Sequence, residues 1–266
     1  MKLDYGTQLS PAPITLSIGT VKKPTLDEIS KITFGRFYFY ESLMTSSAQD
    51  YYGIILGDVE TIWTQMNEDE RDKATMYDMI LVDKELQRFF MEMFNFFMEE
   101  DVYYLDGFFI VMKPGCDFDG QLNIDTIRGV IQKSNFNEVL GILRQVCCIG
   151  GDEEPEKELK FKNKKAREIY EKIQKGKKKQ AEAKKKDMNL SIPNIISSVA
   201  NKHSSLNLVN IWGLTIFQLL DSFNRLQSNA VYDIDSMRVS TWGDEKKTFD
   251  MALWYKNYYD KNDRSK

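Results

Sequence analysis

Histidine, cysteine and proline are scarce in this chain of 266 residues, which holds one, three and six of them. A single histidine, His203, cannot build a multi-histidine zinc site, a histidine-pair proton relay or a bis-histidine haem within one chain. Cys116, Cys147 and Cys148 are odd in number and lack Cys-x-x-Cys spacing, so we expect buried, reduced thiols of a cytosolic protein. Six prolines and fifteen glycines exclude a collagen-like or low-complexity chain.

Long apolar runs and phosphate-binding loops are also missing. No run approaches the ~20 apolar residues of a membrane helix, and the opening residues lack the apolar stretch of a signal peptide. Neither Gly-x-x-x-x-Gly-Lys-Ser/Thr nor Gly-x-Gly-x-x-Gly occurs. A Ser-His-Asp or Cys-His nucleophile would have to use His203, whose polar neighbours indicate a helix end or a loop. The sequence therefore predicts no enzyme, no cofactor and no metal site.

Apolar material for a core is plentiful, since 42% of the residues are hydrophobic and 12% aromatic. Helix signals recur in residues 1–151. Thr25 and Glu28 have capping-box spacing, and Asp83 precedes apolar residues spaced by three and four up to Met98. Two aromatic and β-branched runs around Asp106-Gly107 predict a hairpin over 102–112. We further expect an extended segment over 14–18 and helices over 37–43, 47–57, 59–66, 124–131 and 138–149, the last with capping-box spacing at Asn135.

Charged residues are unevenly distributed along the chain. Residues 156–187 carry fourteen Lys and Arg against six Asp and Glu, and residues 175–187 hold seven Lys with Ala181 and Ala183 as the only apolar side chains. Such a run is typical of a solvated, mobile linker. Nucleic-acid contact is a weaker alternative, because aromatic residues are not interleaved and the pI is about 5.3. A third interpretation is that this segment docks onto an acidic protein surface, which the flanking parts of the same chain could also provide.

A short apolar stripe precedes the lysine-rich run. Within a charged helix predicted over 162–174, one face carries Ala166, Ile169, Tyr170 and Ile173. This stripe can dock on the same chain or on a partner, and the sequence does not choose.

The C-terminal part is predicted to be helical. One helix begins near Pro193, a second covers 210–226 with Asp221 and Arg225 paired four residues apart, and a last one follows Gly243. Trp212, Phe217 and Trp254 are candidates for partner contact, with burial in the core as the competing interpretation. The whole chain is therefore predicted to be mainly α: a helical N-terminal domain with a small β-hairpin (1–151), a basic charged helix or linker (152–189) and a C-terminal helical domain (190–266).

Several blocks of the sequence carry a resemblance to a known family. The N-terminal blocks are Leu3-Asp4-Tyr5-Gly6-Thr7, Ile14-Thr15-Leu16-Ser17-Ile18-Gly19-Thr20 and Lys23-Pro24-Thr25. The C-terminal blocks run from Ile195 to His203, from Asn210 to Trp212 and from Leu214 to Leu226, followed by Trp242-Gly243-Asp244-Glu245-Lys246-Lys247 and Trp254-Tyr255-Lys256. Together they resemble tail assembly chaperones encoded in the tail-gene clusters of phages and prophages of Gram-positive bacteria.

This resemblance implies a helical protein without catalytic residues. Its partners would be the tape-measure protein or tail-tube subunits, and its place would be the host cytoplasm during phage assembly. Ile169, Tyr170 and Ile173 would join Trp212, Phe217 and Trp254 as partner-binding residues, and self-association is compatible with the pattern. Many such chaperones are shorter and gain their C-terminal part by a translational frameshift, whereas this chain is long and continuous. That departure leaves a structural role in the finished tail or baseplate as the alternative, with a DNA-associated role behind it.

Overall fold

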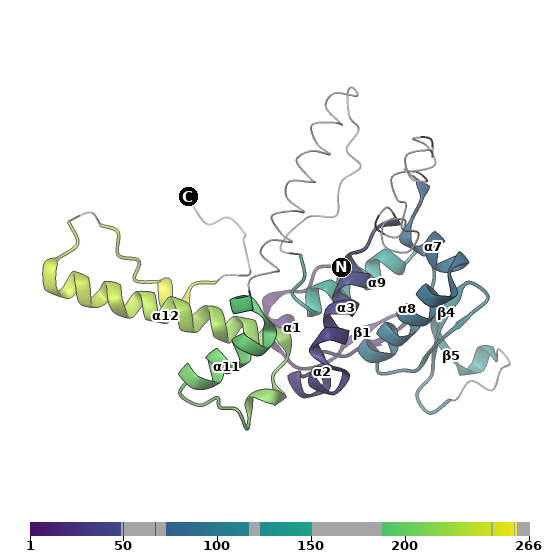
Figure 1. Ribbon diagram of the computed structural model, residues 1–266, viewed down its shortest axis with the longest axis horizontal. Coiled ribbons are helices and arrows are strands. Elements are labelled where there is room, and N and C mark those ends of the chain that lie inside the picture. Colours follow the sequence, from purple (N-terminus) through teal and green to yellow (C-terminus); the bar gives the residue numbers. More distant parts are fainter. Residues whose placement is uncertain are drawn as a thin grey trace. The chain divides into compact units, whose positions relative to one another are not determined.

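The computed structural model describes residues 1–48, 50, 67, 73–116, 123–150, 188–245, 247–257 and 259 (Figure 1). The chain divides into two compact units, Met1–Ile149 and Gly150–Lys266. The described elements are mostly helices, with two small antiparallel sheets in the N-terminal unit. The mainly α class is thus confirmed. The predicted helices over 59–66 and 162–174, the lysine-rich run and most of 47–57 lie outside the described residues.

The N-terminal unit opens with a short helix, a hairpin and two helices. They are α1 (Tyr5–Leu9), β1 (Ile14–Leu16), β2 (Gly19–Val21), α2 (Leu26–Ile32) and α3 (Phe34–Thr45). The extended segment expected over 14–18 is the first strand and turn of this hairpin, in which Ile14 pairs with Val21. The capping box at α2 is confirmed: the Thr25 hydroxyl accepts from the Glu28 amide at 3.3 Å, and the Glu28 carboxylate accepts from the Thr25 amide at 2.8 Å.

A three-stranded antiparallel sheet follows, in the order β3 (Val102–Leu105), β4 (Phe108–Met112) and β5 (Ile127–Ile131). The predicted hairpin is confirmed. The helix predicted over 124–131 is wrong, because only Ile124–Thr126 form a 3-10 turn, η1, before β5 begins. β5 pairs with β4, and the Ile18 backbone approaches Gly129 so closely that an added Cβ would lie 2.4 Å from Ile18 Cα. Tertiary pairing thus overrides the local apolar pattern.

Two helices pack on this sheet, α7 (Met76–Val82) and α8 (Lys84–Phe97), and α9 (Phe136–Val146) packs against them through Phe136. Their shared core is aromatic, with ring centroids 5.0 Å apart for Phe94 and Phe109 and 5.4 Å apart for Phe90 and Phe136. The predicted cap at Asp83 is confirmed, since its carboxylate accepts from the amides of Glu85 and Leu86.

The capping box predicted at Asn135 is wrong. The Asn135 side chain accepts from the Gln132 amide at 2.8 Å and donates to the Val130 carbonyl at 2.9 Å. It therefore fixes the turn before α9 and does not cap the helix, which the structure places over Phe136–Val146. Cys147 lies just after α9 and is buried, as its place on the apolar stripe predicted.

The C-terminal unit contains η2 (Met188–Leu190), α11 (Ile192–Lys202), η3 (Ile211–Gly213), α12 (Ile216–Trp242) and η4 (Leu253–Tyr255). The helix near Pro193 is confirmed as α11. The helix predicted over 210–226 begins only at Ile216, because the Asn207 and Asn210 side chains bond backbone amides and hold a turn there. It then continues to Trp242, well past the predicted end.

The last predicted helix, after Gly243, is wrong apart from the single 3-10 turn of η4. The Asp244 carboxylate accepts hydrogen bonds from the amides of Thr248 and Phe249, both at 3.0 Å. These bonds satisfy the backbone in a loop where the aromatic pattern favoured a helix. Among the described residues, none of the helices has the length and apolar content to cross a membrane.

Candidate protein-interaction surface

The core of the C-terminal unit forms where α11 packs against the first half of α12. α11 buries Ile195, Ile196 and Val199, and α12 buries Ile216 and Leu219. The predicted ion pair is present, with Arg225 Nε 3.2 Å from the Asp221 carboxylate. A capping box begins α12, since the Thr215 hydroxyl and the Gln218 side chain each accept from the other residue's amide, at 3.3 and 3.0 Å.

Trp212 lies in η3, at the end of the loop between α11 and α12. Its side chain is half-buried, and its Nε1 donates a hydrogen bond to the Leu208 carbonyl at 2.8 Å. This bond fixes the loop residues Leu208 and Val209, whose exposed fractions are 56% and 89%. Trp212 thus stabilises a small exposed apolar loop, and part of its own ring is also accessible to solvent.

Phe217 belongs to the interior of the unit. Only 3% of it is exposed, and its ring centroid lies 4.6 Å from that of Tyr259. The contacts of a buried ring of this kind stabilise the folded unit and are not accessible to a partner protein. In this structure Phe217 is therefore placed to hold the C-terminal segment against α12.

Trp254 is the most open of the three aromatic candidates. It lies in η4 with an exposed fraction of 52%, and its neighbours Met251 and Tyr255 are 70% and 58% exposed. The Trp254 and Tyr255 rings meet edge to face, with centroids 5.0 Å apart and an interplanar angle of 82°. We call Met251, Trp254 and Tyr255 the aromatic edge. Asp250 supports it by accepting from the Ala252 amide at 3.0 Å and pairing with Lys256.

The second half of α12 carries exposed apolar residues that the sequence analysis did not single out. Val231, Ile234, Met237 and Trp242 are 50%, 64%, 65% and 78% exposed. Leu226, Ala230, Ile234 and Met237 continue the spacing of three and four residues beyond the predicted helix end. That spacing is the signal that would have located them. The candidates Ile169, Tyr170 and Ile173 lie outside the described residues.

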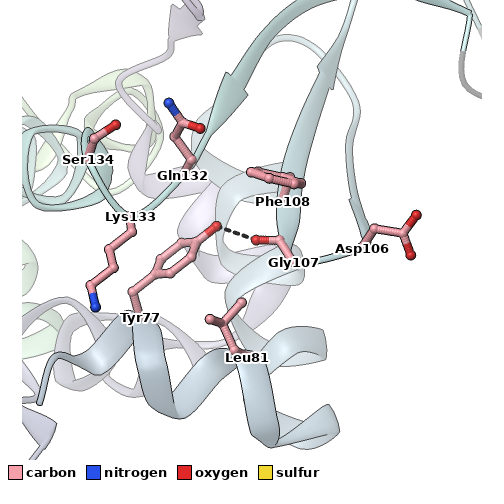
Figure 2. A pocket seen from close by; sticks show the side chains of 8 residues that line it. All are labelled: Tyr77, Leu81, Asp106, Gly107, Phe108, Gln132, Lys133 and Ser134. Carbon is pink, nitrogen blue, oxygen red and sulfur yellow. Dashed lines mark hydrogen bonds between the residues drawn. The ribbon is translucent and has the colours of Figure 1, made fainter.

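The N-terminal unit contains an open pocket of about 550 Å³ (Figure 2). Tyr77 and Leu81 of α7 form one side, the β3–β4 turn with Gly107 and Phe108 forms another, and Gln132–Ser134 form a third. The Tyr77 hydroxyl donates to the Gly107 carbonyl at 2.6 Å, and Lys133 Nζ pairs with the Asp78 carboxylate at 2.6 Å. Two polar groups of the pocket, the Tyr77 hydroxyl and the Lys133 ammonium, are therefore already engaged within the protein.

The titratable groups of the N-terminal unit include several with shifted pKa values. Burial raises the pKa of Tyr77 to about 12, with a smaller contribution from Tyr104. Burial also raises the pKa of Cys148 to about 12 and that of Cys147 well above its ordinary value. Both thiols are therefore protonated near neutral pH, and a protonated thiol is a poor nucleophile.

His203 occupies the helix end that the sequence predicted. It follows α11, and its Nδ1 accepts from the amides of Ser205 and Leu206, both at 3.1 Å. Among the described residues, His, Cys, Asp and Glu form no group of three or more that could hold a metal ion.

The described parts of the chain thus form a mostly helical protein whose C-terminal unit presents apolar side chains to solvent, an arrangement typical of protein–protein interaction modules. The model of the YomV second domain, from a phage-derived family, matches residues 178–259. This range includes α11, α12 and the aromatic edge. No curated protein and no solved structure gives a significant match to the chain.

Proposed function

We propose that this protein is a phage tail assembly chaperone that binds the tape-measure protein, tail-tube subunits or both during tail morphogenesis. The proposal draws on the family resemblance of the opening and C-terminal blocks and on the match of residues 178–259 to a phage-derived domain. The observation that carries it is the aromatic edge, because its three large side chains lie within five residues and are each more than half exposed.

The mechanism is physical. A long client helix with an uncovered apolar face aggregates unless that face is shielded from water. Trp254 and Tyr255 offer large, rigid rings, and such aromatic anchors dominate the energy of protein interfaces. The formal net charge of −4 helps to keep the complex in solution until the tail-tube subunits assemble around the client. Binding must remain reversible, which a small surface of this kind provides.

A test of this proposal co-expresses the protein with the tape-measure protein of the same tail-gene cluster. We expect the soluble fraction of the tape-measure protein to rise severalfold and the two chains to co-purify. Trp254→Ala combined with Tyr255→Ala should abolish both effects. Phe108→Ala is the matched control, because Phe108 is 44% exposed but lies in the N-terminal unit. Circular dichroism of each variant confirms folding, and unchanged capture by the double variant would reject the aromatic edge as the client site.

The alternative is a structural component of the finished tail or baseplate. It is favoured by the length of the chain, because many chaperones that the sequence resembles are shorter. The two roles differ in where the protein ends up. A chaperone stays in the host cytoplasm and is absent from purified virions, whereas a tail component is present there in a fixed ratio to the tail-tube protein. Quantitative mass spectrometry of purified virions separates them.

A further inference from the structure

The loop between α11 and α12, residues 203–215, is held by side chains that bond its own backbone. Asn207 Oδ1 accepts from the Asn210 amide at 3.2 Å, and Asn210 Oδ1 accepts in return from the Asn207 amide at 2.8 Å. The Trp212 indole donates to the Leu208 carbonyl at 2.8 Å. These three side chains keep the same donors and acceptors at any pH near neutrality, because amide and indole groups do not titrate there.

His203 is the fourth side chain that holds this loop, and it is the one of the four that titrates near neutral pH. Its Nδ1 accepts from the amides of Ser205 and Leu206, both at 3.1 Å, and lies 3.3 Å from the Ser205 hydroxyl. A backbone amide can only donate, so Nδ1 must carry its lone pair and the ring proton must lie on Nε2. The arrangement therefore requires the neutral imidazole.

A proton on Nδ1 would convert this acceptor into a donor. The two amides would then lose their partner and face a third N–H group, which is unfavourable. Protonation of His203 therefore favours a loop in which the ring has released the Ser205 and Leu206 amides.

The charged groups around α11 offer the protonated ring no compensation in this arrangement. α11 and the loop carry Lys202 as their only charged side chain, and η2, which packs on α11, carries none. The first half of α12 also packs on α11, and its two charged residues, Asp221 and Arg225, form an ion pair with each other. Among these elements the nearest charge along the chain is thus the positive charge of Lys202, which disfavours a second positive charge beside it.

We propose that His203 is a pH-sensitive switch of the loop between α11 and α12. The neutral ring holds the Ser205 and Leu206 amides, and the protonated ring releases them. The same loop carries Leu208 and Val209, which are 56% and 89% exposed, so release changes how these apolar side chains are presented to solvent. The proposal is independent of the chaperone function, because it rests on the loop alone and not on the aromatic edge.

Hydrogen exchange of the Ser205 and Leu206 amides in the full-length protein tests the switch. Exchange rates divided by the intrinsic chemical rates report how often the loop opens. An ordinary histidine is half-protonated near pH 6.5, so if only the released loop takes up the proton, opening becomes about tenfold more frequent at about pH 5.5 than at about pH 7.5. The amide of Val199, which is buried in α11, is the internal reference and should keep its protection.

Two variants separate the switch from a general effect of acid. His203→Asn should keep the loop closed at both pH values, because an asparagine oxygen can accept from amides two and three residues ahead and does not titrate. His203→Ala should leave the loop open at both pH values, because it has no acceptor. Circular dichroism confirms that each variant is helical. Equal corrected rates at the two pH values in the natural protein, or a tenfold response that persists in either variant, would overturn the proposal.

Discussion

At the scale of single residues, Tyr77 links pH to stability. Its pKa is raised to about 12 by burial, whereas a tyrosine in an unfolded chain ionises near pH 10. Between about pH 10 and 12 the unfolded state releases the phenol proton and the folded state keeps it, so the free energy of unfolding falls as the pH rises through this window.

Tyr77→Phe should therefore flatten this decline. At neutral pH the variant is expected to lose about 1 kcal/mol of stability, because the Gly107 carbonyl loses its donor. Urea unfolding at about pH 8 and about pH 11 measures both effects. Tyr255→Phe is the control, since Tyr255 is 58% exposed. An equally steep decline in Tyr77→Phe and the natural protein would contradict the assignment.

Phe217 and Trp254 should behave differently on truncation, although both are large aromatic residues of the C-terminal unit. Phe217→Ala leaves a cavity beside Tyr259 and is expected to lower the free energy of unfolding by about 3–5 kcal/mol. Trp254→Ala removes a side chain that is 52% exposed and should cost less than about 1 kcal/mol. Chemical denaturation followed by circular dichroism compares them. Equal losses would mean that Trp254 is part of the core.

At the scale of elements, the start of α12 depends on one capping box. Thr215→Ala removes the acceptor for the Gln218 amide and should destabilise the C-terminal unit by about 1 kcal/mol. Thr241→Ala, at the exposed end of the same helix, is the matched control and should change the stability by less than about 0.5 kcal/mol. Thermal unfolding measured for both variants checks the difference. A loss at Thr241 as large as that at Thr215 would argue against the capping box.

At the scale of the whole molecule, the composition of residues 175–187 predicts a mobile connection between separately folding parts. Seven lysines and only two apolar side chains cannot offset the entropy of ordering this stretch. Limited trypsin digestion should cut there first and leave two resistant fragments of about 170 and 75 residues. If trypsin spares this stretch and cuts elsewhere first, the segment is instead held against a partner surface.

Local chemistry was enough to predict many elements from the sequence. Thr25 with Glu28 and the cap at Asp83 are bonds between near neighbours, and the Asp106-Gly107 turn closes a hairpin without distant help. Apolar spacing likewise located α8, α11 and the first half of α12. The same spacing, followed past Leu226, would have located the exposed residues Ile234 and Met237 in the second half of α12.

Tertiary structure decided the features that depend on contacts between distant residues. Residues 127–131 form β5 because they pair with β4 and because the Ile18 backbone packs closely against Gly129. Both partners are distant in the sequence, so the local residue pattern could not predict this strand. Periodicity placed Phe217 and Trp254 alike among apolar residues, but only the packing of the segment after α12 buries the first and leaves the second in solvent. A sequence specifies which residues can be apolar contacts. It does not specify their partners, because the burial of a side chain depends on the residues that pack against it, and only the tertiary fold brings those residues together.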